Sequence, residues 1–392
     1  MMRKALIFAA AFIVVLSGMA FAAAKAKVAI VKGTPHDLIG DSFKFSMFDF
    51  RKRWESTWSA KSEKAIEDMV RKAVDLAGGF PDVKGKNVMI KVNLVQDMWF
   101  VFSIESQRAR WTNTAMRDAD WFNHQVQSIL TDVRVARAVA LICKEKGAKK
   151  VTIIESPNAG NTHAYYLVYG YMDMAKKLNP EMDQWTHKGG WLELYDCNDA
   201  VADGTWKYYK PKRGGLHGLD EYPLPNNWVN ADVRISVGKM KTHDNAGVSL
   251  TLKNVGIGIP PTRIIGAIKL GLPHDKTQWV VADVNSIAPI DYSIVDAIWA
   301  VEGWGAFYGE PVPMDLVIAG KDAVAVDATG TRVMGLEPSF YGVIRACAES
   351  GLGTYKADEI EVVGDSIASV MRQFDIGAIR GVGKYVTTPT AW

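Results

Sequence analysis

The feature that most constrains the fold is an alternation of short apolar, β-branched runs with longer amphipathic patterns. The first three runs cover residues 27–32, 87–94 and 150–155, and helical patterns at residues 60–77 and 131–147 separate them. Strands that alternate with helices in this way pair in parallel, because each crossover helix returns the chain to the same edge of the sheet. The sequence therefore predicts an α/β fold with a mostly parallel or mixed sheet and crossover helices.

The pattern continues toward the C-terminus with one interruption. Further elements are expected as strands at residues 232–237, 314–319 and 359–363, as a helix at 338–351, and as a helix or tight strand at 291–301. Between residues 179 and 230 the periodicity weakens, and aromatic residues are mixed with glycine, proline and basic residues. We interpret this segment as an aromatic-rich insertion of small strands and loops packed over the sheet, with the aromatic rings in a satellite core.

Composition places the chain among globular proteins. Hydrophobic residues make up 48% and charged residues 23% of the 392 positions, enough for one large core or two moderate ones. The net charge is +3, and two of the positive charges, on Arg3 and Lys4, lie in a segment expected to be removed. A nearly neutral chain argues against nucleic acid as the main partner, since phosphate neutralisation needs a clustered basic surface.

The N-terminal residues resemble a signal peptide. Arg3 and Lys4 precede an apolar stretch that is too short to span a bilayer, and Ala20-Phe21-Ala22 supplies small residues at the −3 and −1 positions. We expect cleavage after Ala22, with an uncleaved anchor as the alternative. Residues 23–392 would then form a single exported α/β domain, periplasmic or secreted, with no stable membrane span.

The cysteines limit the cofactors that this chain can bind. Cys143, Cys197 and Cys347 are three in number, widely spaced, and none lies in a C-x-x-C motif. Ligation of an iron–sulfur cluster by four cysteines of this chain is therefore excluded on count alone. Cys143 and Cys347 lie in apolar helical patterns, where a small core residue is the expected role.

Polar side chains follow several of the predicted strands where each strand ends. They are Lys91 and Asn93, Glu155 and Ser156, and Lys239 and Lys241. The carboxyl ends of parallel strands meet at one edge of the sheet, and ligands collect outside that edge. This coincidence is the strongest indication of a site in the sequence.

The stretch from Asp232 to Pro261 concentrates such residues. After the predicted strand, Lys239, Lys241 and His243 are followed by a predicted helix that Asp244 or Asn245 would cap and that carries Lys253 and Asn254. Free N–H groups at a helix N-terminus, together with nearby cations, favour an oxyanion. The alternative is that each lysine forms a salt bridge with a carboxylate elsewhere in the domain.

Three later carboxylates, Asp296, Glu302 and Asp327, are candidates for the acidic side of the cleft. Asp327 lies among apolar neighbours in the sequence, so it needs a partner, either a lysine of the central stretch or a metal. None of the seven histidines lies in a ligand spacing such as H-x-x-x-H. The metal ligands are therefore unknown, and a divalent metal remains an alternative.

These observations lead to three functional hypotheses. In the first, the chain is an enzyme for a small anionic substrate, a carboxylate or a phosphate, with lysines that neutralise the anion and His243 or an acidic residue as the proton carrier. Its catalytic residues would be Lys241, His243, Asp296 and Asp327, and its ligand-binding residues Lys91, Asn93, Glu155, Ser156, Lys239, Lys253, Asn254 and Glu302. The second is a non-catalytic protein that binds an anion, metal or glycan. The third is an accessory subunit of an exported redox complex, with a protein partner.

Several of these motifs resemble the domain-of-unknown-function 362 family. The central motif, Gly238-Lys239-Met240-Lys241-Thr242-His243 followed by Thr251-Leu252-Lys253-Asn254, is similar to that of the family. The shorter motifs are Lys91-Val92-Asn93-Leu94, Ile154-Glu155-Ser156, Ile294-Val295-Asp296 with Glu302-Gly303, and Gly320-Lys321-Asp322 with Val326-Asp327, so that the resemblance covers about residues 27–365.

The resemblance implies a fold more than an activity. Many members of this family look like redox proteins because ferredoxin-type cysteine motifs accompany the domain. This chain has no such motif, and it has Val92 where the family usually has proline. A redox role inferred from those members therefore does not carry over to this chain.

Overall fold

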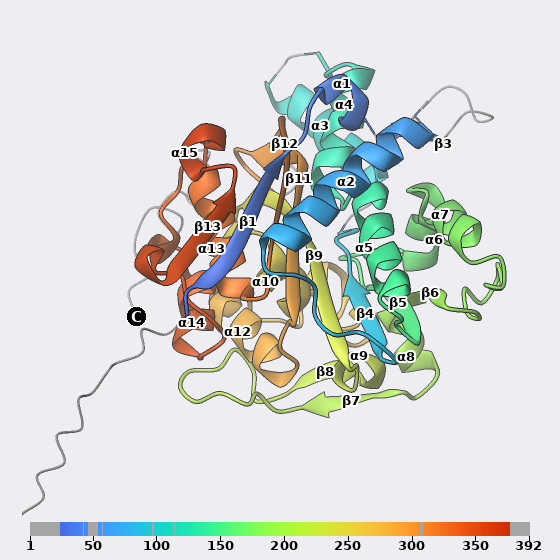
Figure 1. Cartoon of the computed structure of the whole chain (residues 1–392), viewed down its shortest axis with the longest axis vertical. Helices are drawn as coiled ribbons and strands as arrows, with labels where there is room; N and C mark the ends of the chain where they lie inside the picture. The colour runs from blue at the N-terminus through green and yellow to red at the C-terminus, as the bar shows by residue number, and fades with distance from the viewer. Residues whose placement is uncertain are drawn as a thin grey trace, which may run out of the picture.

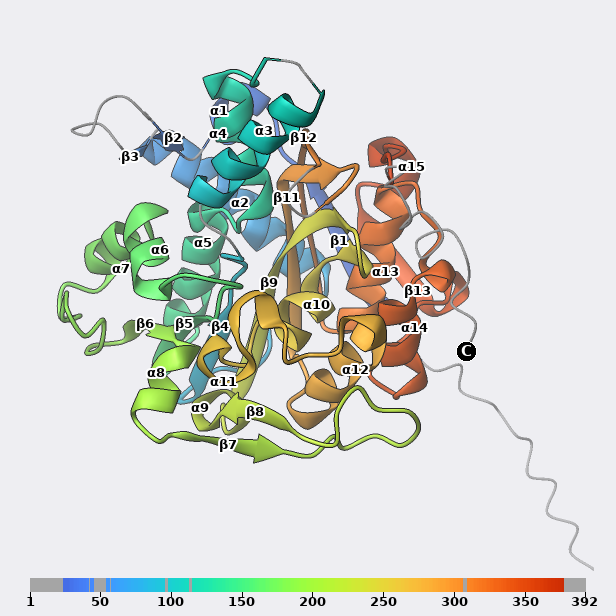
Figure 2. The same cartoon turned by 180° about the vertical axis from the view of Figure 1, so that it is seen from behind.

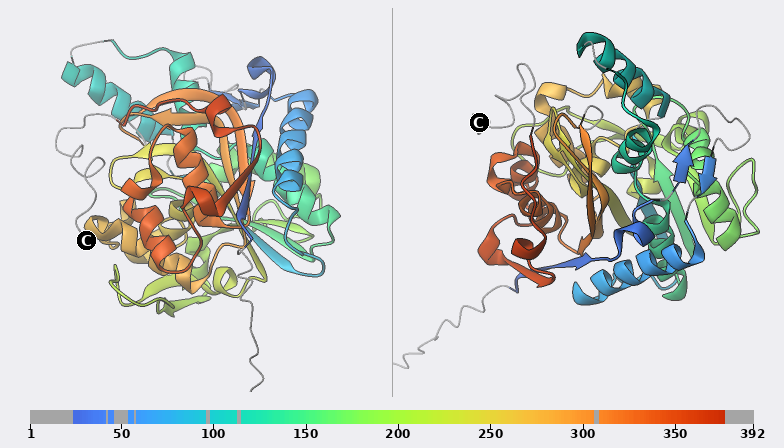
Figure 3. Two further views of the ribbon diagram at one scale, coloured as in Figure 1. Left: turned by 60° about the vertical axis from the view of Figure 1, so that its left-hand side comes forward. Right: turned by 90° about the horizontal axis from the view of Figure 1, so that it is seen from above.

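The computed structural model describes residues 24–41, 43–45, 54–56, 58–95, 98–112, 115–305 and 309–376. The predicted signal peptide lies outside these residues, so cleavage and export stay predictions. The chain forms one large mixed sheet with helices on both faces (Figure 1). The view from above in Figure 3 shows the sheet between its two helical layers. The predicted fold class is confirmed.

The main sheet has nine strands in the order β13-β1-β12-β11-β9-β4-β5-β6, with β10 paired to β9. The strands are β1 (Ala26–Lys32), β4 (Asn87–Lys91), β5 (Lys150–Glu155), β6 (Leu192–Asp196), β9 (Val233–His243), β10 (Gly247–Ser249), β11 (Tyr292–Glu302), β12 (Glu310–Gly320) and β13 (Ile360–Gly364). Two small antiparallel pairs lie outside it, β2 (Phe43–Phe45) with β3 (Trp54–Ser56) and β7 (Trp206–Tyr209) with β8 (Tyr222–Pro225).

The sheet is mixed because one half is parallel and the other is not. Strands β11, β9, β4, β5 and β6 pair in parallel, whereas β12 runs antiparallel to both β11 and β1. The carboxyl ends of the five parallel strands therefore lie along one edge. Residues 291–301, for which the sequence left a helix or a strand open, form β11.

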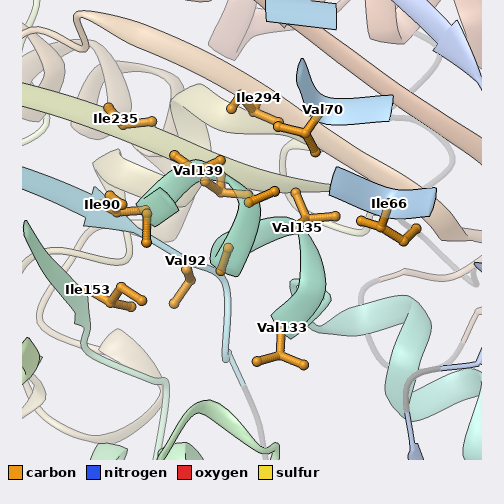
Figure 4. Packing of buried hydrophobic residues seen from close by; sticks show 14 of the residues in the cluster. Ile66, Val70, Ile90, Val92, Val133, Val135, Val139, Ile153, Ile235 and Ile294 are labelled. Carbon is orange, nitrogen blue, oxygen red and sulfur yellow. The ribbon is translucent and has the colours of Figure 1, made fainter. Parts of the chain in front are cut away.

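One face of the sheet is covered by α2 (Ala60–Leu76), α4 (Ala119–Ile129) and α5 (Val133–Glu145) (Figure 1). Apolar residues recur on one side of α2 and α5 at helical spacing, so each helix buries a stripe against the strands. Figure 4 shows Val70 and Val139 packed near Ile90, Ile235 and Ile294 in this layer. Hydrophobic burial of this kind is the main source of stability for the fold.

The opposite face carries α10 (Thr251–Gly256), α12 (Thr277–Ile287), α13 (Ala323–Val333) and α14 (Gly342–Glu349) (Figure 2). Asp322 caps α13, and its carboxylate accepts the N–H of Ala325 at 2.9 Å. The remaining helices are α1 (His36–Ile39), α3 (Met98–Thr112), α6 (Thr162–Val168), α7 (Tyr171–Leu178), α8 (Cys197–Ala202), α9 (Asn226–Val229), α11 (Thr262–Ile265), α15 (Ile367–Val370) and four short 3-10 helices, η1 (Ala267–Lys269), η2 (His274–Lys276), η3 (Pro338–Phe340) and η4 (Ala357–Glu359).

The segment at residues 179–230 differs in part from the expected insertion. It supplies β6, an edge strand of the main sheet that pairs in parallel with β5 and is buried along its whole length. The rest forms α8, the β7–β8 pair and α9 beneath the sheet (Figure 2). Tyr222 and Trp228 are fully buried there, in the satellite core that the sequence predicts.

The central stretch also differs from the expectation of a helix that begins near residue 244. Strand β9 continues to His243, turns, and pairs with β10, so α10 begins only at Thr251. Asp244 and Asn245 therefore belong to a hairpin turn rather than to a helix cap. Gly238 lies within β9, where a Cβ atom would come 2.6 Å from the carbonyl carbon of Leu250. This close backbone approach brings β9 and the start of α10 together.

Two further observations concern the cysteines and the possibility of a membrane-spanning helix. All three cysteines are free and buried. Among the helices that the structure describes, none combines the length and apolar character needed to cross a bilayer.

Candidate functional site

A cleft lies where β4, β5 and β9 end and α10 begins, outside the parallel half of the sheet. Its volume, including the open mouth, is about 380 Å³. Eight of the twelve candidate residues line it: Lys91, Asn93, Glu155, Ser156, Lys241, His243, Lys253 and Asn254. Residues more than a hundred positions apart in the sequence thus meet at the predicted edge.

Lys91 and Glu155 form a buried ion pair in the floor of the cleft. The distance from Lys91 Nζ to Glu155 Oε1 is 2.6 Å, and the ammonium also donates to the Val92 carbonyl and to Asn254 Oδ1. The other Glu155 oxygen accepts the N–H of Leu94 at 2.5 Å. The carboxylate neutralises Lys91. For this lysine, the alternative of a salt bridge with a carboxylate elsewhere in the domain is therefore correct.

Gly258 makes room for this pair. A Cβ atom at Gly258 would lie 2.6 Å from Lys91 Nζ and 2.2 Å from the Asn254 carbonyl oxygen. Only a residue without a side chain lets α10 end this close to the buried ammonium.

Lys241 has neutral partners only. Its ammonium donates to Asn93 Oδ1 at 3.2 Å and to the Ile129 carbonyl at 3.0 Å, and within the described ranges it forms no ion pair with a carboxylate. Burial lowers the pKa of Lys241 well below its usual value, and the nearby Lys253 and Lys239 ammonium groups lower it further.

Lys253 projects from α10 into the same cleft. Across the described part of the chain, its ammonium donates no hydrogen bond and forms no ion pair. Burial lowers the pKa of Lys253 to about 8, an effect that Asp244 opposes and Lys91 reinforces. Lys253 is thus a cation held beside other cations without a partner of its own.

His243 is neutral at pH 7. Burial and the neighbouring Lys253 ammonium lower its pKa to about 4. Its Nδ1 lies 2.8 Å from Asp244 Oδ1, which also accepts the N–H of Asn245 at 2.8 Å. Nδ1 also accepts the N–H groups of Asn245 at 3.1 Å and of Ala246 at 3.4 Å, so its contacts lie within the hairpin turn and Nε2 is the nitrogen left to face a ligand.

The structure places Lys239 and Asp296 together, but away from the cleft lining. Lys239 Nζ lies 3.0 Å from Asp296 Oδ2, which also accepts the N–H of Asp132 at 2.6 Å. Arg134 in turn pairs with the Asp132 carboxylate. Burial raises the pKa of Asp296, and the Lys239 ammonium opposes that rise. The four groups form a buried, charge-balanced network between β9, β11 and α5.

Asp327 and Glu302 also lie outside the cleft lining, contrary to the expectation of a cleft with an acidic side. Asp327 accepts the N–H groups of Thr251 and Leu252, each at 2.9 Å, so the protein's own carboxylate occupies the N-terminus of α10. Its expected partner, a lysine or a metal, is replaced by backbone donors. Burial raises the pKa of Asp327 to about 7. Glu302 pairs with Arg372 at the surface.

Lys269 is a residue that the sequence does not single out. It is buried behind Ser156, and its ammonium donates to Ser156 Oγ at 3.0 Å and to the Pro260 carbonyl at 2.6 Å. Burial lowers the pKa of Lys269 to about 7. The backbone at Ile268 and Lys269 has φ of 52° and 58°, a strained conformation for residues with side chains. The sequence around it carries no periodic signal that would have marked it.

A second group of polar residues lies beyond β5 on the same edge. Within the described residues, one ligand atom each from His163, Asp196 and Asp199 could hold a metal ion, and these atoms lie within 4.8 Å of one another. The members of this group come from three separate elements, so no short histidine spacing in the sequence marks them.

The charges of the lining residues determine which ligands the cleft can bind and which chemistry it can support. Lys91 and Lys239 each have a carboxylate partner, whereas Lys241 and Lys253 have none, so the lining is basic after internal pairing. Beside them stands a neutral imidazole. This set suits the binding of an oxyanion and the transfer of a proton.

The family model described as "Domain of unknown function (DUF362)" matches residues 119–332. A thylakoid-associated protein of Synechocystis sp. is 24% identical over 244 residues, which cover 60% of this chain and 67% of that protein.

Two solved structures are similar at a lower level. The lactate racemase apoprotein from Thermoanaerobacterium thermosaccharolyticum has a TM-score of 0.40 and 12% identity, with 78% of this chain and 62% of that chain covered. A protein from Thermotoga maritima has a TM-score of 0.35 and 12% identity, with 74% and 59% covered. The chain thus covers less than two thirds of each of these structures.

Proposed function

Because the chain belongs to the family described as Domain of unknown function (DUF362), whose description names no activity, we propose a function from the cleft itself. The cleft binds a small oxyanion ligand, a carboxylate or a phosphate. The observation that carries the proposal is that Lys241 and Lys253 line one cleft and neither has a carboxylate partner.

Electrostatics supports this proposal. In addition to burial, the Lys253 ammonium lowers the pKa of Lys241 and of His243, and Lys241 lowers that of His243, because neighbouring positive charges without a counter-ion repel one another. An oxyanion between Lys241 and Lys253 would remove that repulsion and accept two charge-assisted hydrogen bonds. Each such bond contributes about 1.5–3 kcal/mol in a partly dry site.

We further propose that the protein is an enzyme in which His243 moves the proton. A general base must be unprotonated at the working pH, and the low pKa of His243 meets this requirement. Asp244 and the N–H groups of Asn245 and Ala246 hold the ring at Nδ1, which leaves Nε2 for the substrate. Asn93 supplies an amide group in the cleft lining to position a polar substrate, whereas the Asn254 amide is hydrogen-bonded to Lys91 and Ser236.

The proposal is tested by equilibrium titration with a panel of inorganic phosphate, phosphomonoesters and small carboxylates. Saturable binding of at least one of them is expected. Lys253→Met should weaken it by at least about tenfold, the loss of one charge-assisted hydrogen bond. Lys149→Met is the matched control, because Lys149 is an exposed lysine outside the cleft and should bind as the wild type does. Unchanged affinity in Lys253→Met would overturn the proposal.

Turnover separates the enzyme from a binding protein. Any member of the panel that binds is followed for conversion with the wild type and with His243→Gln. The enzyme proposal predicts conversion by the wild type and a fall of at least about a hundredfold in kcat without His243. Binding that depends on Lys253 without any conversion would identify a non-catalytic binding or accessory protein instead.

A further inference from the structure

The second polar group lies next to the cleft but is built for a ligand of the opposite charge. His163 lies in the first turn of α6, Asp196 ends β6, and Asp199 lies on α8. We propose that these three residues bind a divalent transition-metal ion, with His187 as a positioning residue. The inference does not rest on the function proposed for the cleft.

The geometry gives each nitrogen of His163 a separate role. Nε2 lies 2.9 Å from Asp199 Oδ2, so it faces the carboxylates. Nδ1 lies 2.6 Å from Nδ1 of His187, which is 5% exposed. A histidine that ligates a metal with one nitrogen is usually oriented by a hydrogen bond at the other, and His187 is placed to make it.

Asp196 provides an independent sign that a cation belongs here. Its side chain is only 4% exposed, and in the described part of the chain it forms no ion pair with a lysine, arginine or histidine. One of its oxygens accepts the N–H of Asn198 at 2.8 Å and caps α8. A buried carboxylate without a cationic partner is costly, and a metal ion would neutralise it together with Asp199.

The donor set indicates the class of metal. One imidazole nitrogen and two carboxylate oxygens suit Zn²⁺, Mn²⁺ or Fe²⁺, whereas Ca²⁺ and Mg²⁺ are held by oxygen ligands alone. Three protein ligands leave coordination positions for water or a substrate, as in catalytic rather than structural metal sites.

The proposed metal site is connected to the cleft through the backbone and through hydrogen bonds. Asp196 is the register partner of Glu155 across β5 and β6, and Glu155 lines the cleft. Asn198 donates to Thr262 Oγ1 at 3.1 Å, and the Thr262 N–H bonds Ser156 Oγ at 3.3 Å. Metal and anion sites are thus neighbours along one sheet edge.

The test is a titration of the chelator-treated full chain with Co²⁺, followed by its visible d–d absorption, and with Zn²⁺ in competition. One equivalent is expected to bind. Asp199→Asn and Asp196→Asn should each weaken Co²⁺ binding by at least about tenfold, and asparagine at position 196 keeps an N-cap for α8. His187→Gln should weaken it by about 10- to 100-fold, as for other residues that orient a ligating histidine.

Matched controls exclude binding at surface groups. Asp203→Asn removes an exposed carboxylate at the end of α8, and His274→Gln removes an exposed histidine remote from the group. Both should bind Co²⁺ as the wild type does. Absence of a stoichiometric site, or affinity unchanged in Asp199→Asn, whose side chain is 30% exposed, would overturn the inference. Loss of binding in His274→Gln would overturn it equally.

Discussion

At the scale of single residues, the presence or absence of a carboxylate partner divides the lysines of the central region. Lys91 and Lys239 are held in buried ion pairs, the first with Glu155 and the second with Asp296. Lys241 and Lys253 are left with neutral partners or none. The first two stabilise the ends of the strands, and the second two make the cleft basic.

The pKa of Lys253 predicts how anion binding depends on pH. Below about pH 8 the ammonium is charged and attracts the anion; above it the amine is neutral, so affinity should fall. Sulfate is the suitable probe because its charge is constant from about pH 6 to 10. Lys253→Arg, whose guanidinium stays charged, should lose less affinity at high pH than the wild type does, because only Lys241 can still lose its proton. Sulfate affinity of the wild type that does not change across this range would contradict the role of Lys253.

The Lys239–Asp296 pair predicts a cost in stability. Lys239→Met leaves Asp296 as an uncompensated buried charge, so the free energy of unfolding should fall by about 3–5 kcal/mol. The double variant Lys239→Met/Asp296→Asn should recover part of this loss because no buried charge is left alone. Urea denaturation of the wild type and both variants measures the difference. A loss below about 1 kcal/mol in Lys239→Met would show that the pair is not needed.

At the scale of elements, α10 shows how a short helix can be fixed from both ends. Asp327 occupies the N–H groups at its start, and Gly258 permits Lys91 to approach its end. The helix N-terminus is therefore not the anion site that the sequence predicts. The anion site proposed here is formed by side chains that α10 and β9 direct into the cleft.

Removal of the Asp327 carboxylate tests this account of α10. Asp327→Ala leaves two buried N–H groups of α10 without acceptors, so the free energy of unfolding should fall by about 3 kcal/mol. Asp358→Ala is the control, since Asp358 is an exposed carboxylate in the short helix η4. Chemical denaturation monitored by circular dichroism gives both values. Equal stability of the two variants would contradict the capping role.

Sequence periodicity predicted the elements better than their ends. The strands at β1, β4, β5, β9 and β12 and the helices α2 and α5 were predicted because their apolar residues repeat over several turns or pleats. Strand β10 has three residues, too few to show alternation, and the turn at Asp244-Asn245 suits a helix cap and a hairpin equally well. The start of α10 was therefore placed seven residues too early.

Which acidic side chain pairs with which lysine could not be predicted from the sequence. The basic residues at the strand ends were expected to meet because parallel strands end at one edge, and eight candidates do line one cleft. Which acid neutralises which lysine depends on contacts between distant segments, such as β9 with β11. Lys269 and the group of His163, Asp196 and Asp199 were not predicted either, because neither belongs to a periodic pattern.

At the scale of the whole molecule, the two halves of the sheet have different roles. The parallel half carries both proposed sites at its carboxyl edge, and the antiparallel strands β1 and β12 complete the core. A ligand that joins β4, β9 and α10 in the cleft should therefore stabilise the whole domain. We expect sulfate at 100 times its Kd to add about 2.7 kcal/mol to the free energy of unfolding.

Thermal unfolding of the full chain measures this effect. The Tm should rise with sulfate concentration in the wild type and in Lys149→Met, and should not rise in Lys253→Met. Sodium chloride at equal ionic strength separates specific binding from screening. Equal shifts of Tm in all three proteins would mean that sulfate acts on the surface in general.

The most direct measurement is a crystal structure of the full chain grown with selenate, whose selenium atom is located by its anomalous scattering. The account predicts a selenium peak in the cleft, with selenate oxygens about 3 Å from Lys241 Nζ and Lys253 Nζ. A cleft with both lysines in place and no selenate between them, in crystals that bind selenate elsewhere, would contradict it.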